Sequence, residues 1–100
     1  MIIAVEEDRL QISGRPGATV RFAEITEVAS EKVSKIAYDE VFLIIRELSG
    51  NAITLGELDE GFAEAERALR SRLLGFPSDW STAAEQAPVG VRAQVWQTQP

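Results

Sequence analysis

The 100-residue sequence contains no histidine and no cysteine, and these two absences exclude several classes of chemistry. Without cysteine, the chain has no disulfide, no thiolate nucleophile and no cysteine-ligated metal. Without histidine, no catalytic triad can use an imidazole as its base. Carboxylates remain as the acid and base groups, and we expect no catalytic residue, no cofactor and no metal site.

Basic residues are also few. The chain has 10 Lys and Arg residues against 16 Asp and Glu residues, which gives a net charge of -6. The basic residues are scattered among acids, whereas phosphate groups and anionic membranes are bound by clustered Lys and Arg. We therefore expect neither nucleic acid nor a membrane surface as a partner.

Long apolar runs are missing as well. No uninterrupted apolar run exceeds five residues, and a helix that crosses a bilayer needs about 20. The apolar N-terminal residues have no basic residue before them and are followed at once by Glu6, Glu7 and Asp8. A secretory signal needs that basic flank, so we predict a cytoplasmic protein.

Short apolar or alternating segments, separated by turn residues, fill the first 57 residues. This pattern predicts about six antiparallel strands. Their expected ranges are 2–5, 9–13, 18–22, a polar segment that ends near 36, 41–48 and 52–57. The polar segment is predicted to be an edge strand, because charged side chains discourage pairing with a second copy. The residues expected to fill the core are Leu10, Ile12, Val20, Phe22, Ile53 and Leu55.

Residues 41–48 form the strongest predicted strand and are apolar on both faces. Val41, Leu43 and Ile45 share one face, and Phe42 and Ile44 lie on the other. A strand that is apolar on both faces needs cover on both. We expect the face with Phe42 and Ile44 to be covered by the C-terminal tail or by a second copy of the chain.

An amphipathic helix of about four turns is predicted after residue 59. Its apolar face consists of residues spaced three and four apart: Phe62, Ala65, Leu69 and Leu73. Asp59 suits the N-cap position, and Gly75 followed by Pro77 suits the end. Gly61 costs about 1 kcal/mol in a helix, so we expect it to pack closely against the sheet.

Residues 78–100 are predicted to be a tail with a short helix near 79–86 and a strand-like segment near 91–96. The tail carries both tryptophans of the chain, Trp80 and Trp96. Large aromatic side chains are rarely left in water. We therefore predict that the tail docks on the same domain, over the outward face of strand 41–48.

Six short antiparallel strands followed by one amphipathic helix resemble the pleckstrin-homology-like (PH-like) barrel. The chain is similar in particular to a group of small bacterial proteins with that expected fold. The shared segments are 10–12 before a Gly and Pro turn, 22–28, 39–45, 55–57 leading to 61–62, and 74–80. The resemblance implies a mostly β, α+β fold: a barrel of six to seven strands and its closing helix at 1–77, with the tail at 78–100.

The chain differs from the lipid-binding PH-like proteins in its first strands. Those proteins use a basic cluster there, whereas this chain has Arg9 and Arg15 as isolated basic residues among acids. We therefore expect no phosphoinositide binding. The resemblance implies an architecture and no particular activity.

Three groups of carboxylates are the only candidates for acid-base or metal chemistry. They are Glu6, Glu7 and Asp8; Asp39 and Glu40; and Glu57, Asp59 and Glu60. A catalytic pair needs one carboxyl group in a desolvated setting, and all three groups fall in predicted turns. No segment has the ligand spacing of a calcium loop. We interpret these acids as solvated turn residues.

Five aromatic or apolar residues are candidates for a protein interface: Tyr38, Phe42, Ile44, Trp80 and Trp96. Tyr38 falls at a predicted loop tip, where it either caps its own loop or contacts a partner. Each tryptophan either docks within the chain or anchors a partner.

The sequence thus predicts a non-enzymatic domain that acts through apolar contacts with a protein partner or with a second copy. A second hypothesis is an acidic immunity or inhibitor protein that masks a basic toxin or nuclease. The second hypothesis requires that acids gather on one face. An enzyme with a pocket inside the barrel is disfavoured, because the residues predicted to face inward are apolar.

Overall fold

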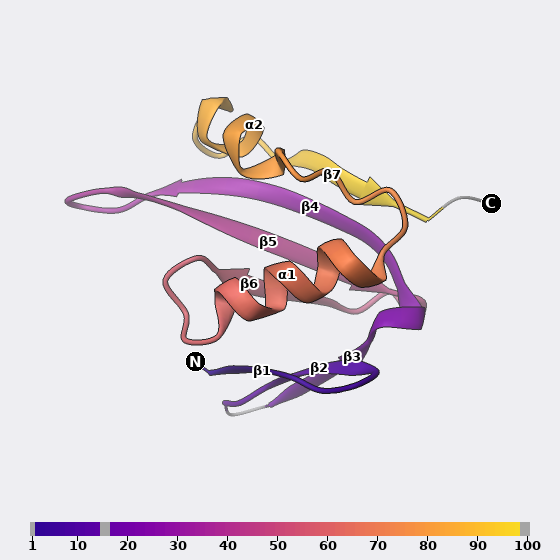
Figure 1. Ribbon diagram of the computed structural model, residues 1–100. Helices are drawn as coiled ribbons and strands as arrows, with labels where there is room; N and C mark the ends of the chain where they lie inside the picture. Colours follow the sequence, from indigo (N-terminus) through magenta and orange to yellow (C-terminus); the bar gives the residue numbers. More distant parts are fainter. Residues whose placement is uncertain (1, 15–16, 99–100) are drawn as a thin grey trace.

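The structure is a computed structural model that describes residues 2–14 and 17–98. These residues form two antiparallel sheets and two α-helices, which confirms the predicted α+β class (Figure 1). The first sheet contains β1 (Ile3–Val5), β2 (Arg9–Ile12) and β3 (Ala18–Arg21), in that order. The second sheet contains, in spatial order, β6 (Ala52–Gly56), β5 (Asp39–Glu47), β4 (Ile25–Ser34) and β7 (Ala93–Gln97).

Alternation along the first sheet places one of its faces in the core. Leu10 pairs with Val20 across β2 and β3, and both are buried, as is Ile12. On the other face, the Thr19 hydroxyl donates a hydrogen bond of 3.0 Å to Gln11. The predicted Gly and Pro turn between these strands includes residues 15 and 16, which lie outside the described residues.

β4 and β5 form the longest hairpin, and its tip extends beyond the rest of the chain (Figure 1). The 3-10 helix η1 (Phe22–Glu24) leads from β3 into β4. The prediction that this polar strand lies at an edge is wrong, because β7 pairs with it from the far end of the sequence. The charges of β4 instead form ion pairs across the sheet: Glu27 with Arg46, and Glu31 with Arg92.

Helix α1 (Phe62–Arg72) packs its apolar face into the core that both sheets share. Ala65 and Leu69 are fully buried, which confirms the predicted helix face. The predicted N-cap is wrong: the helix begins after Gly61, and the Asp59 carboxylate accepts a hydrogen bond from the Gly56 amide instead. Gly61 has φ of +89° and lies directly against the Ile3 carbonyl group, so the close packing expected of this glycine is confirmed.

The tail consists of helix α2 (Trp80–Gln86) and strand β7. Trp80 is 6% exposed, and its indole N–H donates to Glu66 of α1 at 3.0 Å. Trp96 lies opposite Val28, on the core side of β4. The tail therefore packs on the face of the sheet opposite to the predicted one, because β7 pairs with the free edge of β4 and turns its apolar residues inward.

The two sheets are not closed into one barrel in the part of the chain that the structure describes, so the predicted PH-like barrel is not confirmed. β3 and β6 are edge strands of their sheets. A cavity of about 310 Å³ separates β3 from the β5–β6 hairpin, and its apolar lining includes Ala18, Val20, Ile45 and Ile53. This cavity marks the open side of the fold.

Candidate functional site

The second sheet has one face toward the core and one face away from it. The residues that face the core include Val28, Leu43, Ile45 and Leu55. Because side chains alternate along a strand, Ala29, Val33, Phe42 and Ile44 lie on the opposite side, and none of them belongs to the core cluster. We call these four residues the outer face. Both α-helices bury their apolar residues in the core cluster, on the other side of the sheet.

A shallow depression of about 300 Å³ lies on the outer face. Its lining residues are Glu31, Val33, Lys35, Phe42, Ile44, Thr54 and Arg92. Apolar side chains form its floor and charged side chains form its rim. The Lys35 ammonium group lies 5.6 Å from the centre of the Phe42 ring, within range of a cation-π attraction.

Gly56 lies next to this depression, because it is the cross-strand partner of Phe42, which lines it. A Cβ atom at Gly56 would lie 2.9 Å from Phe42 Cε1 and 2.6 Å from Glu40 Oε2. The aromatic ring and the carboxylate therefore both rest against the bare α-carbon. A glycine inside a strand often marks such a close approach.

Two more carboxylates lie next to Gly56. Asp59 Oδ2 accepts the Gly56 amide at 2.9 Å and would lie 3.3 Å from the same Cβ position. Glu57 Oε1 accepts the Val41 amide at 3.0 Å, and the Glu57 amide donates to the Val41 carbonyl group at 3.1 Å. These two hydrogen bonds fix the loop after β6 against the start of β5. Glu40 and Asp59 thus lie against Gly56 at one end of the outer face, and Glu57 is bound to the Val41 amide.

Glu40 departs from the sequence prediction. It was expected to be a solvated turn residue, but it is only 7% exposed. Glu40 is the second residue of β5, opposite Val33, so its side chain points to the same side as Phe42 and Ile44. The sequence pattern predicts that this strand begins at residue 41, whereas β5 begins at Asp39.

Some of the charges elsewhere are paired. The described residues contain five ion pairs: Arg9 with Asp8, Arg21 with Glu24, Arg46 with Glu27, Arg70 with Glu66, and Arg92 with Glu31. Asp8 is exposed as predicted, and the hydrogen bond from Arg9 lowers the pKa of its carboxyl group. None of these ion pairs includes Glu40, Glu57 or Asp59.

The five residues predicted for an interface do not form one surface. Phe42 and Ile44 lie together on the outer face, and Tyr38 is 52% exposed in the turn at the tip of the β4–β5 hairpin. The Tyr38 carbonyl group accepts the Lys35 amide at 2.7 Å, which closes that turn. Trp80 and Trp96 lie on the core side of the sheet and contact other parts of the same chain.

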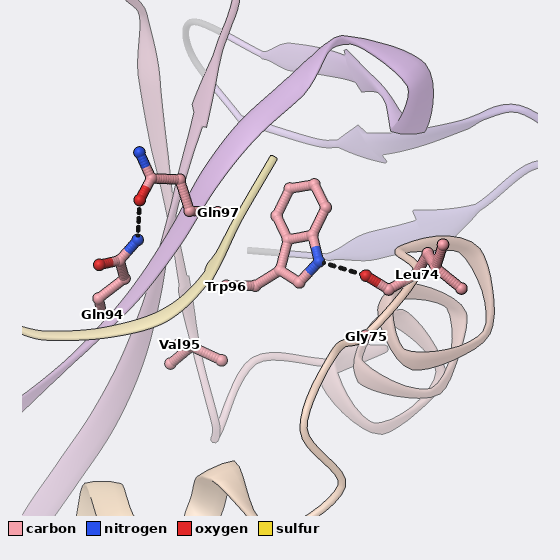
Figure 2. Close-up of a pocket in the computed structure, with 6 residues that line it drawn as sticks. All are labelled: Leu74, Gly75, Gln94, Val95, Trp96 and Gln97. Atoms are coloured by element: carbon pink, nitrogen blue, oxygen red, sulfur yellow. Dashed lines mark hydrogen bonds between the residues drawn. The ribbon is translucent and has the colours of Figure 1, made fainter. Parts of the chain in front are cut away.

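Trp96 borders a different cavity, of about 390 Å³ (Figure 2). Figure 2 shows its indole directed toward the end of α1, where Nε1 donates to the Leu74 carbonyl group at 2.8 Å. The polar lining is also paired internally, since Gln94 donates to Gln97 at 2.6 Å. The indole and the two amides hold β7 in place, and we assign this region a structural role.

Two residues of the outer face site were not recognised from the sequence. Glu40 and Asp59 were interpreted as solvated turn acids, and their approach to Gly56 depends on the pairing of β5 with β6. The signal available in the sequence was Gly56 itself, a glycine in a segment that otherwise alternates as a strand.

The chain matches no protein-family model, no curated protein and no solved structure. Among the described residues, no group of three or more acidic side chains is arranged to hold a metal ion. Neither helix in residues 2–14 and 17–98 has the length and apolar character needed to span a membrane.

Proposed function

We propose that this protein is a non-enzymatic binding domain and that its binding surface is the outer face of the four-stranded sheet. The observation that supports the proposal best is the pair of large apolar side chains, Phe42 and Ile44, which lie outside the core cluster on the side of the sheet away from both helices. Phe42 is half-buried and Ile44 is 9% exposed, and both line the depression. An apolar floor with a charged rim is the composition of many protein interfaces.

The partner is expected to bring apolar side chains to the floor of the depression. Val33, Phe42 and Ile44 supply the apolar contact, and aromatic residues at the centre of an interface often carry much of its energy. Self-association through the same surface is one form of this function, because the rim carries both acids and bases.

A second candidate function is the masking of a basic protein, as an immunity or inhibitor protein would do. The observation that favours it is the placement of two carboxylates, Glu40 and Asp59, against Gly56 at one end of the outer face. Acids that face a basic partner speed association and select against acidic ones. The two candidates share one surface and differ in the charge of the partner.

Site-specific crosslinking in the native host tests the surface. A photo-crosslinking residue at Thr54, which is exposed on the rim of the depression, is compared with one at Ala63, exposed on α1. We expect a discrete protein adduct from position 54 and none from position 63. Phe42→Glu in the position-54 protein should remove the adduct, provided that circular dichroism shows an unchanged melting curve.

Sedimentation of the purified chain shows whether the partner is a second copy of the chain or a different protein. A dimer at high micromolar concentration that Phe42→Glu turns into a monomer identifies a second copy as the occupant. A monomer together with a heterologous adduct identifies a different protein. Equal adducts from positions 54 and 63, or an adduct that survives Phe42→Glu, would contradict the proposal.

We also propose that the fold is a relative of the PH-like barrel that is open on one side. The features that support this relation are the two antiparallel sheets, their common core and the helix α1 that packs into it. An experimental structure in which β3 and β6 pair directly would restore the closed barrel. An experimental structure in which the sheets pack in another order would contradict the proposed relation to the PH-like barrel.

A further inference from the structure

The edge strands of the two sheets differ in how well they are protected from pairing with another strand. Short length, charge, bulges or a covering segment usually protect such an edge. β1 has three residues, and its Ile3 amide donates to the Glu60 carbonyl group at 2.8 Å. β3 carries Arg21, and the pairing of β7 with β4 contains a register shift. β6, in contrast, has five uncharged residues in regular register with β5, so it is the least protected edge in the described part of the chain.

The hydrogen bonds between β5 and β6 show which backbone groups of β6 point outward. The Glu47 amide donates to the Asn51 carbonyl group at 3.0 Å at the start of this pair. Bonded and non-bonded residue pairs alternate in an antiparallel ladder. The N–H and C=O groups of Ile53 therefore point toward β5, and those of Ala52 and Thr54 point away from it.

The loop after β6 closes one end of this edge. The Gly56 amide donates to Asp59 Oδ2, and the Gly56 carbonyl group accepts from the Asp59 amide, both at 2.9 Å. Ala52 and Thr54 precede this closed end and are exposed, and no described strand pairs with them on this side. Their outward N–H and C=O groups can therefore receive an extended segment.

The same edge borders the cavity of about 310 Å³ on the open side of the fold. Ile53 lines this cavity from β6, and Ala18 and Val20 line it from β3. Residues that lie opposite each other in a strand pair share a face of the sheet. A segment paired with β6 would thus direct the residue opposite Ile53 into the cavity and its two neighbours to the outer face. Because β3 forms the other wall, this space suits one extended segment better than a second folded copy.

We propose that β6 binds an extended segment of the partner protein as an added strand, and that an apolar side chain of this segment fills the cavity beside Ile53. The inference rests on the proposed function, because it names the form in which the partner reaches the edge of the outer face. Backbone bonds to Ala52 and Thr54 supply affinity, and the cavity selects the side chain. A charged side chain is disfavoured, because it would lose its hydration there.

Short peptides test the site without the partner. The probes are acetylated and amidated pentapeptides with two threonines on each side of a central valine, leucine or phenylalanine, added to the ¹⁵N-labelled full chain. For at least one of them, we expect saturable chemical shift changes at the amides of Ala52, Ile53 and Thr54. Hydrogen exchange at Ala52 and Thr54 should slow when this peptide binds. The same peptide with a central aspartate should bind several-fold more weakly.

Blocked backbone groups separate strand addition from mere apolar contact. A peptide that is N-methylated at its second and fourth residues keeps its side chains but cannot donate to β6, so it should bind at least about fivefold more weakly. Thr54→Pro removes one outward N–H from β6, a change that an edge strand tolerates. Thr54→Ala keeps that N–H, so it should bind the peptide at least about fivefold more tightly than Thr54→Pro does. Thr82→Ala, at an exposed position of α2, is the control and should leave the affinity unchanged.

Ala18→Leu tests the cavity and leaves β6 unaltered, so it serves even if Thr54→Pro does not fold. The larger side chain takes up part of the cavity from the β3 side. The leucine-centred peptide should therefore bind more weakly to this variant than to the parent chain. An alanine-centred peptide needs less room and should bind equally to both.

Three results would overturn the inference. The first is the lack of saturable shifts at Ala52, Ile53 and Thr54 with all three apolar peptides. The second is equal affinity of the N-methylated peptide and its parent. The third is a dimer, seen by sedimentation without peptide, that Thr54→Pro converts to a monomer, because a second copy would then occupy the edge.

The outcome is separable from that of the proposed function. If no peptide binds but the Thr54 adduct forms and depends on Phe42, the outer face binds its partner without strand addition. If the peptides bind and no adduct forms, the edge of β6 accepts a strand but the outer face is not a protein interface.

Discussion

At the scale of single residues, the absence of a side chain at Gly56 shapes the candidate site. Gly56→Ala would bring a methyl group within 2.6 Å of Glu40 Oε2 and 2.9 Å of Phe42 Cε1. Both groups would have to move in a packed strand pair, so we expect a loss of about 1–3 kcal/mol in the free energy of unfolding. Urea denaturation followed by circular dichroism measures this loss.

Two further variants show whether the loss arises from the contact. Thr54→Ala changes an exposed residue of the same strand and should alter the free energy of unfolding by less than about 0.5 kcal/mol. In Glu40→Ala, the closest obstacle to the new methyl group is gone, so Gly56→Ala should cost less in that background than alone. Equal costs in both backgrounds would mean that the Glu40 contact is not the cause.

The residues of the site could be predicted from the sequence only in part. Phe42 and Ile44 were identified because period-two alternation around Val41, Leu43 and Ile45 assigns them to the opposite face. Glu40 could not be identified, since its burial depends on the exact end of the hairpin and on Gly56 across the strand. Strand ends are the least certain part of a pattern-based prediction.

At the scale of elements, the start of α1 depends on one glycine. Gly61 has a positive φ, and a side chain there would also overlap the Ile3 carbonyl group of β1. Gly75 has a similar φ of +83° but no atom within 4 Å of its Cβ position. Gly61→Ala should therefore cost at least about 3 kcal/mol, whereas Gly75→Ala should cost about 1 kcal/mol from the backbone conformation alone.

Thermal and urea unfolding of the two glycine variants measures the difference between their losses of stability. Because both variants carry the same conformational penalty, the difference reports the contact between α1 and β1. If the two variants lose equal stability, the first turn of α1 does not pack closely on β1 and its placement is wrong.

The docking of α2 is a second prediction at this scale. Trp80 is 6% exposed, stacks at a tilt against Phe62 and donates to Glu66. Trp80→Ala should lower the free energy of unfolding by about 3–5 kcal/mol. Trp80→Phe keeps most of the ring contact and should cost about 1–2 kcal/mol, because Glu66 retains its ion pair with Arg70.

Stability and binding, measured separately, distinguish a structural tryptophan from an interface residue. Chemical denaturation of the monomeric chain gives the stability of each variant, and the Thr54 crosslinking assay gives its binding. A Trp80→Ala protein with unchanged stability and lost binding would show that Trp80 belongs to the interface instead of the core.

Elements whose pattern lies within their own sequence were predicted correctly. Features that depend on pairing between strands far apart in the sequence were not. The face of α1 follows from residues three and four positions apart, such as Ala65 and Leu69, and the structure confirms it. The polar sequence of β4 predicts an edge strand. Its neighbour β7 comes from more than 60 residues further along the chain, and no pattern within β4 indicates that pairing.

At the scale of the whole molecule, the remaining question is how the two sheets meet. β3 and β6 are edge strands in the described residues, and the cavity of about 310 Å³ lies on this side of the fold. In an edge strand, alternate amides point away from the neighbouring strand and have no partner in the sheet. β5, in contrast, is paired on both sides, with β4 and with β6.

Hydrogen exchange of the ¹⁵N-labelled chain tests this arrangement. Amides from Phe42 to Arg46 of β5 should be protected throughout, because these residues pair with β4 on one side and with β6 on the other. Along β3 and β6, protection should alternate: amides directed toward β2 or β5 exchange slowly, and those directed toward the open side exchange quickly. Continuous protection along both β3 and β6 would mean that the two strands pair with each other and that the sheets form a closed barrel after all.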